Sequence, residues 1–218
     1  MPAIVAVAQA KPIAFADAWT FMAEGDRYAE SVEAYYAPAV WWSIGPMVGE
    51  MRTADRSHTA RHEMLQANLL LKRWNLDNAQ GNLFASLGVG TTYTTLAARP
   101  GVAHPGHADD RPAFYAEQGF RHVLQGDYET RRIYTSFKID VHRTPLFFDR
   151  VDTVQAGFSP YAHDYEDLAV WFIAQAKRYR GMNDKSSLGG FVRLFRKNWW
   201  VELGVSDRKP QAMFMYNY

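Results

Sequence analysis

The residues most able to perform chemistry in this chain are a few serines, histidines and aspartates in short polar stretches. Ser57 is followed by His58, and His62 stands four residues further on. A serine beside a histidine can act as a nucleophile with its general base. None of these residues has the G-x-S-x-G setting that exposes a nucleophilic serine on a sharp turn. His163-Asp164 also stands alone in a turn-like stretch. Isolated histidines of this kind are usually solvated, so we predict that the chain is not an enzyme.

A second candidate is a metal site in the longest polar break, residues 95–112. His104 and His107 are three residues apart there, and Asp109 and Asp110 follow. Imidazole and carboxylate ligands suit zinc or copper. The prolines and glycines of this stretch offer no rigid frame for such ligands. We therefore expect no cofactor, and the sequence leaves open whether this stretch binds metal.

The elements that would position any site are strands, because apolar and polar residues alternate along most of the chain. In the clearest run, 131–143, Ile133, Phe137 and Val141 share one face and Lys138 lies on the other. Turn residues separate the runs at nearly even spacing. The predicted strands are 18–24, 31–37, 40–52, 62–74, 82–94, 113–125, 131–143, 151–159 and 168–179, with three more inside 188–218.

Two segments, 30–36 and 165–180, also fit amphipathic helices. In the second, Leu168, Trp171 and Phe172 stand at helical spacing, and periodicity alone does not distinguish a short helix from a strand. Their neighbours alternate clearly with period two. We therefore predict strands in both places and an all-β fold.

The end of the chain is unusual. The final run places Phe214, Tyr216 and Tyr218 on one face and ends the chain on an aromatic residue. The termini of soluble domains usually fray in water, whereas a last strand that closes a barrel must pair with the first. This ending resembles the C-terminal strand of bacterial outer-membrane β-barrel proteins, where alternating aromatic residues and a terminal aromatic serve as an assembly signal.

The resemblance implies a closed antiparallel up-and-down transmembrane β-barrel of about 12 strands over residues 18–218, and the even count suits such a barrel. In size and strand count the chain is similar to the monomeric oligogalacturonate- and sialic-acid-specific channels. With the N-terminus in the periplasm, 95–112 is the fifth connection and falls on the outer side. Residues 1–17 would be a signal-peptide remnant or a disordered N-terminus, because an apolar run precedes the small-x-small pattern Ala8-Gln9-Ala10.

Composition agrees with this class and excludes others. Aromatic residues make up 15% of the 218 residues, the formal net charge is +1 and there is no cysteine. Abundant rings suit the aromatic girdles of a barrel, and the small net charge gives no pull toward nucleic acid. The lack of cysteine argues against a disulfide scaffold. The mean hydropathy of −0.33 excludes a helical membrane protein, and no segment reaches the ~18 consecutive apolar residues of a transmembrane helix.

The face opposite the lipid would line the lumen of such a barrel. Its charged residues are Lys72, Glu117, Arg121, Lys138, Asp140, His142, Lys177, Arg193 and Glu202. In one interpretation these charges pair across the lumen and hold the barrel shut. In the other they form a selectivity lining, and the excess of basic residues favours anionic solutes.

We therefore predict a channel for small polar or anionic solutes in the bacterial outer membrane. Its surroundings would be outer-membrane lipid and lipopolysaccharide, and nucleic acid would not be a partner. Three alternatives stay open. One is a barrel enzyme acting on lipid. Another is a closed barrel that is structural or binds a periplasmic or membrane protein. The third is a soluble lipocalin- or sandwich-type β protein, which would need the apolar faces to form its core.

Overall fold

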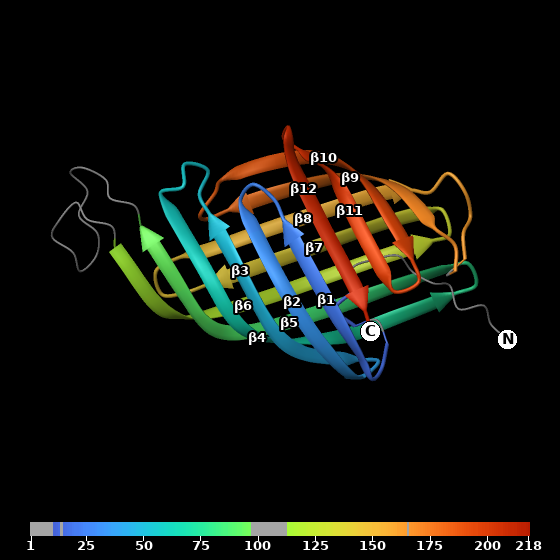
Figure 1. The fold of residues 1–218 in the computed structure, drawn as a ribbon, viewed down its shortest axis with the longest axis horizontal. Coiled ribbons are helices and arrows are strands. Elements are labelled where there is room, and N and C mark those ends of the chain that lie inside the picture. Colours follow the sequence, from blue (N-terminus) through green and yellow to red (C-terminus); the bar gives the residue numbers. More distant parts are fainter. Residues whose placement is uncertain (1–10, 14, 97–112, 165) are drawn as a thin grey trace.

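The computed structural model describes residues 11–13, 15–96, 113–164 and 166–218. They form one closed barrel of twelve antiparallel strands (Figure 1). The strands are β1 (Ala18–Gly25), β2 (Ala29–Ala39), β3 (Trp42–Arg52), β4 (His58–Leu76), β5 (Ala79–Leu96), β6 (Ala113–Thr130), β7 (Ile133–Arg143), β8 (Phe148–Phe158), β9 (Ala169–Arg180), β10 (Lys185–Arg196), β11 (Trp199–Ser206) and β12 (Lys209–Asn217). The prediction of an all-β closed barrel is confirmed. None of the described residues belongs to a helix able to cross a membrane.

The last strand closes the barrel on the first. β12 pairs antiparallel with β1, with Tyr216 opposite Phe21. Beyond the end of β12, the backbone N–H groups and carbonyls of Trp19 and Tyr218 exchange two hydrogen bonds of 2.8 Å. The aromatic ending therefore pairs with the start of the chain, as predicted, and this closure leaves no free sheet edge.

The two ends of the barrel differ. We call the end where β1 begins and β12 finishes the termini end, and the opposite end the loop end. At the termini end, four of the five connections contain two residues each, and only 159–168 is longer. The loop end carries the connections 26–28, 53–57, 144–147, 181–184 and 207–208, and β5 and β6 reach residues 97–112 there. The longest connection thus lies on the predicted side, opposite the termini.

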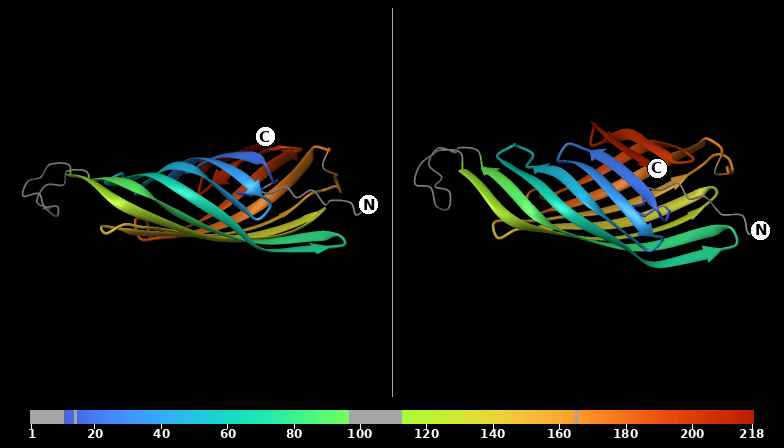
Figure 2. Two further views of the ribbon diagram at one scale, coloured as in Figure 1. Left: turned by 90° about the horizontal axis from the view of Figure 1, so that it is seen from below. Right: turned by 60° about the horizontal axis from the view of Figure 1, so that its bottom comes forward.

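The strands differ in length, and the barrel is flattened. β4, β5 and β6 have 19, 18 and 18 residues, whereas the others have 8 to 12. Figure 2 shows these long strands extending past their neighbours and the opposing walls lying close together across the narrow direction. Because the walls are close, side chains from non-adjacent strands meet inside.

Alternate side chains of each strand point outward and inward. Outward positions expose large apolar residues such as Phe114, Phe172 and Leu188, whereas inward positions bury many polar ones. In β11, Leu203 and Val205 are exposed while Trp200 and Glu202 are buried, as the alternation predicted. So much apolar surface is unfavourable in water and suits the lipid-facing band of a membrane barrel.

Candidate functional site in the lumen

The structure places six of the seven predicted lining residues inside the barrel. They are Glu117, Arg121, Lys138, Asp140, Arg193 and Glu202. His142 and Lys177 also point inward. Most of these residues are buried and paired, so their first effect is to bind the walls together.

Lys72 lies elsewhere, on the exposed outer face. A β-bulge between Leu70 and Lys72 changes the register against β5. Leu70 therefore still faces inward, opposite the buried Phe84, while Lys72 pairs with Leu83. An extra residue reverses the direction of every side chain that follows it, so uninterrupted alternation misplaces Lys72.

One group of polar side chains, the Arg121 cluster, joins four strands of the barrel. Arg121 Nε and Nη2 of β6 bind the two carboxylate oxygens of Asp140 on β7 at 3.1 and 2.7 Å. Its Nη1 reaches across the lumen to Glu33 Oε1 of β2 at 3.0 Å and to Gln66 Oε1 of β4 at 2.9 Å. Tyr35 donates a 2.7 Å hydrogen bond to Glu33. Buried charges require this degree of pairing.

A second group, the Arg193 cluster, lies on the opposite side. Arg193 Nε and Nη2 both contact Glu202 Oε2, at 2.8 and 2.7 Å. The guanidinium packs over the rings of Tyr134 and Trp200, with its central carbon 4.3 and 5.0 Å from their centroids. Gln155 of β8 donates a 3.2 Å hydrogen bond to Glu202 Oε1. The cluster therefore combines an ion pair with cation–π contacts.

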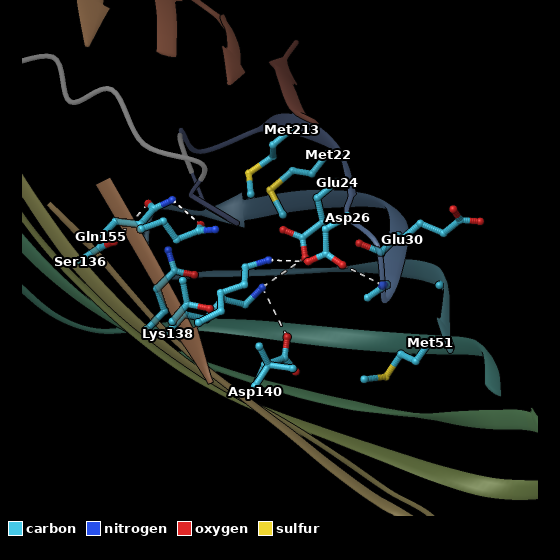
Figure 3. Close-up of a pocket in the computed structure, with 18 of the residues that line it drawn as sticks. Met22, Glu24, Asp26, Glu30, Met51, Ser136, Lys138, Asp140, Gln155 and Met213 are labelled. Carbon is cyan, nitrogen blue, oxygen red and sulfur yellow. Dashed lines mark hydrogen bonds and ion pairs between the residues drawn. The ribbon is translucent and has the colours of Figure 1, made fainter. Parts of the chain in front are cut away.

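A cavity of about 130 Å³ lies beside both clusters and extends to residues of the loop end. Figure 3 shows Glu24, Lys138 and Asp140 pointing into this space from different strands, with Met22 and Met213 above them. Lys138 Nζ is 3.4 Å from Asp140 and 3.8 Å from Glu24. A space of this size and polarity suits a few waters or a small polar molecule.

Asp26, in the turn between β1 and β2, lies at the mouth of this cavity. Lys177 Nζ and Tyr179 Oη of β9 bind its Oδ2 at 2.7 and 2.9 Å. The backbone N–H groups of Tyr28 and Ala29 donate to its Oδ1. Burial raises the pKa of Asp26, but Lys177 and these donors outweigh burial and hold that pKa below its ordinary value. The turn is therefore tied across the mouth to β9.

Toward the termini end, one side of the lumen is filled by an aromatic wall. It comprises Tyr134, Ala169, Trp171, Ile173, Phe191, Phe195, Trp200 and Met215, each 4% exposed or less. These side chains come from β7 and from β9 to β12. Side chains this inaccessible leave no room for water on their side of the lumen, so the barrel's own residues close it there.

The other side is closed by a separate piece of chain, residues 11–13, which we call the strap. Ile13 is fully buried against Ala37 and Phe84, and Ser43 Oγ donates a 2.7 Å hydrogen bond to the Pro12 carbonyl. Lys11 Nζ donates to Gln80 Oε1 at 3.2 Å. Of the stretch 1–17, predicted as a signal remnant or disordered, residues 11–13 thus lie inside the barrel, whereas residues 15–17 are exposed.

Beneath the strap the barrel wall is polar. This polar wall consists of Ser43, Asn68, Asn82 and Asp127, all buried. Asn82 donates a 2.7 Å hydrogen bond to Asp127, and Asn68 donates one of 3.1 Å to Ser43. Burial lowers the pKa of Lys11 to about 8, although the attraction of Asp127 and Glu129 opposes that shift. Polar groups on this wall are therefore satisfied partly by the strap.

The long connection at the termini end also turns inward. His163 in this connection is buried, and its ring meets that of Trp171 edge-on at a centroid distance of 5.4 Å. Burial lowers the pKa of His163 below its ordinary value, with Asp164 and Asp167 opposing that shift. The connection 159–168 therefore covers part of the aromatic wall.

The interior also holds carboxylates that sequence reasoning missed. They include Glu24, Asp26 and Glu33. With these three residues, the described interior holds more carboxylates than basic side chains. Glu33 could have been found, because it alternates with Val32 and Ala34 in a predicted strand. Asp26 stands in a turn, where alternation gives no signal. The basic excess inferred from the sequence is thus offset in the structure.

Two of the candidate catalytic residues, Ser57 and His58, lie side by side at the loop end. Ser57 Oγ lies 2.9 Å from His58 Nδ1 and 2.7 Å from Asp55 Oδ1. Asp55 Oδ1 also accepts a hydrogen bond from the backbone N–H of Ser57, at 3.0 Å. His62 lies inside the lumen, its ring 4.5 Å from that of His142.

No metal site is formed by the described residues, among which no group of three or more His, Cys, Asp or Glu side chains could hold an ion. His104, His107, Asp109 and Asp110 fall outside the described residues.

Comparison with known proteins yields likeness in structure only. No family model matches the chain, and no curated protein matches it. Among solved structures, the translocator domain of the autotransporter NalP from Neisseria meningitidis is 11% identical, with a TM-score of 0.50, covering 92% of this chain and 85% of that one. The KdgM porin is 12% identical, with a TM-score of 0.46 and coverage of 92% and 98%. What the chain shares with the NalP translocator domain is the fold, a closed antiparallel β-barrel.

Proposed function

We propose that this protein is an outer-membrane barrel that conducts small polar solutes and is closed at rest by its strap. The observation that carries the proposal is the polar wall beneath residues 11–13. A barrel that needed only to be filled could pack this side with apolar residues, as the aromatic wall does. Instead Ser43, Asn68 and Asn82 line it, and such groups suit a water-filled passage once the strap leaves.

The strap is held by few contacts, so releasing it should cost less free energy than opening the barrel itself. Its described bonds are those of Pro12 with Ser43 and of Lys11 with Gln80, together with the burial of Ile13. Segments with so few contacts open locally at a fraction of the global unfolding free energy. The loop-end cavity would then continue into the passage.

We infer an outer-membrane location from three features: the exposed apolar band, the short turns at one end and the longer loops at the other. Its lipid and lipopolysaccharide would surround the barrel. A preference for anions is not part of the proposal, because the interior carboxylates match or exceed the basic groups. We expect neutral or cationic solutes to pass more readily.

The test is a reversible disulfide that fixes the strap to the barrel. The chain contains no cysteine of its own, so no other disulfide can form within it. Ile13 and Ala37 pack in one buried cluster, so the double variant Ile13→Cys/Ala37→Cys can join the strap to β2. In planar bilayers we expect discrete openings from the wild type, none from the oxidised double variant, and recovery after reduction. Ile13→Cys alone, treated with the same oxidant, is the matched control.

Two results would overturn the proposal. Conduction by the oxidised variant at the wild-type level would show that the strap is not the gate. A wild type that never conducts, although it folds as judged by a heat-dependent gel shift, would favour the second candidate. That candidate is a closed structural or partner-binding barrel, which the dense aromatic wall favours.

A further inference from the structure

Four arginines gather on one sector of the outer face, at the loop end of β7 to β9. Arg150 of β8 stands directly opposite Arg180 of β9, and Arg178 is opposite Asp152 in the next outward row. Arg143 ends β7 opposite Phe148. We call Arg143, Arg150, Arg178 and Arg180 the basic sector. All point outward, where the rest of each strand meets lipid.

The carboxylates nearby do not balance these charges. Asp152 is shared between Arg150 at 2.7 Å and Arg180 at 3.2 Å. Arg178 pairs with the well-exposed Asp184 at 3.2 Å, and no described carboxylate pairs with Arg143. The side chains of Arg178 and Arg180 are each 51% exposed. Like charges directly opposite on neighbouring strands are destabilising, so an external anion would stabilise the basic sector.

A matched sector at the same end shows that this imbalance is local. On β2 to β4 the outward charges near the loop end are Glu30, Glu50, Arg52, Arg61 and Glu63. Arg52 pairs with both Glu30 and Glu50 at 3.1 Å, and Arg61 pairs with Glu63 at 2.7 Å. In this balanced sector two arginines face three glutamates, whereas the four arginines of the basic sector have only Asp152 and Asp184.

Below the basic sector the lipid-facing surface contains a row of small residues. Ala156, Ala174 and Gly190 are neighbours across β8, β9 and β10. All three are exposed, and a Cβ added at Gly190 would meet no atom within 4 Å. The row on the loop-end side carries Val154 and Leu188 with the small Ala176 between them, and the row on the other side carries Phe158, Phe172 and Val192. The small-residue row is therefore a low strip that continues through Ala176 toward Arg178.

The two features lie at compatible depths. Arg178 is four residues from Ala174 along β9, which is about 13 Å at the rise of a strand. That distance is within half the hydrocarbon thickness of a bilayer, about 15 Å. A molecule with an anionic head and an acyl chain could contact both.

We propose that the basic sector binds a phosphorylated glycolipid of the outer leaflet, with its phosphate on the arginines and an acyl chain over the small-residue row. Arginine suits phosphate because its planar fork of N–H donors forms paired, charge-assisted hydrogen bonds. A free phosphate would use only the arginines and leave the apolar rows unused. The inference rests on the proposed placement in the outer membrane, because only there does the loop end meet such lipids.

The experiment uses the full chain in detergent micelles and measures binding of purified diphosphorylated lipid A by native mass spectrometry. The test variant is Arg150→Gln/Arg180→Gln, and the matched control is Arg52→Gln/Arg61→Gln in the balanced sector. Each lost charge-assisted hydrogen bond should weaken binding about tenfold, so we expect at least that loss in the test variant and little change in the control. Ala174→Phe, which fills the small-residue row, should also weaken binding.

Three outcomes would overturn this inference. The test variant and the control could lose affinity equally, or lipid A stripped of its phosphates could bind as well as the intact form. Phosphatidylglycerol could also bind as tightly as lipid A, which would make the sector a general anionic surface. None of these depends on conduction, so failure of the channel and failure of this site can be told apart.

Discussion

Both sides of the lumen are lined by buried side chains, but different parts of the chain cover them. The aromatic wall on β7 and β9 to β12 is closed by side chains that belong to the barrel itself. The polar wall on β3 to β6 is closed by the strap, a segment outside the strands. A wall built from its own rings can open only if the barrel deforms, whereas a wall covered by a strap can open by local release. The comparison shows why burial alone does not distinguish a filled barrel from a gated one.

The largest effect is expected in the Arg193 cluster, which packs against Tyr134 and Trp200 of the aromatic wall. Arg193→Met would leave Glu202 charged and 1% exposed, and removing one partner of a buried pair costs about 3–5 kcal/mol. Urea unfolding in detergent micelles, followed by tryptophan fluorescence, measures this loss. Adding Glu202→Leu should recover most of it. Lys11→Met in the strap is the matched control and should cost about 1 kcal/mol; equal losses would erase the distinction between the two sides.

The next effect separates local from global opening. Trp171→Ala should lower the free energy of unfolding by about 3–5 kcal/mol, the usual cost of removing a large buried ring. Ile13→Ala should lower that free energy by only about 1 kcal/mol, as expected for Lys11→Met, because the strap can detach while the barrel stays folded. Hydrogen exchange measured on peptides covering residues 11–17 and 169–173 tests this. We expect Ile13→Ala to speed exchange only in the first peptide, and faster exchange in both would contradict local release.

The smallest effect is a pH dependence at the connection 159–168. Because burial lowers the pKa of His163, the unfolded chain binds a proton more readily than the folded one. The free energy of unfolding should therefore fall as the pH drops below the ordinary histidine value of about 6.5. Unfolding at pH 7.5 and pH 5 gives the measurement, and His163→Leu should reduce the difference. If that variant keeps the full pH dependence, the dependence arises from other groups.

Sequence reasoning located the strands well because their signal is local. The run 131–143 alternates so clearly that β7, at Ile133–Arg143, begins within two residues of its prediction and ends where predicted. The long strands were harder, because β4 and β6 continue through residues such as Arg73 and Gly126 that fit no apolar alternation. For the lumen, alternation gave the inward direction of Arg121 and Arg193 but not their partners.

The failures share one feature, which is that alternation within a single strand carries no signal for them. Lys72 was misplaced because a single extra residue in β4 changes its register with β5. The pairing of Arg121 with Glu33 joins residues 88 positions apart and depends on how the flattened barrel brings β6 near β2. The strap leaves no periodic signal, because three residues are too few to show one.

The sequence by itself determined the alternation of faces, the number of strands and the aromatic strand that closes the barrel. These properties follow from the two-residue repeat of a strand, which each short segment expresses without reference to the rest. The tertiary structure alone decided which charges meet, which side of the lumen is polar and what fills it. Those properties depend on the register and flattening of the closed barrel, because only closure sets the distance between strands that are not neighbours.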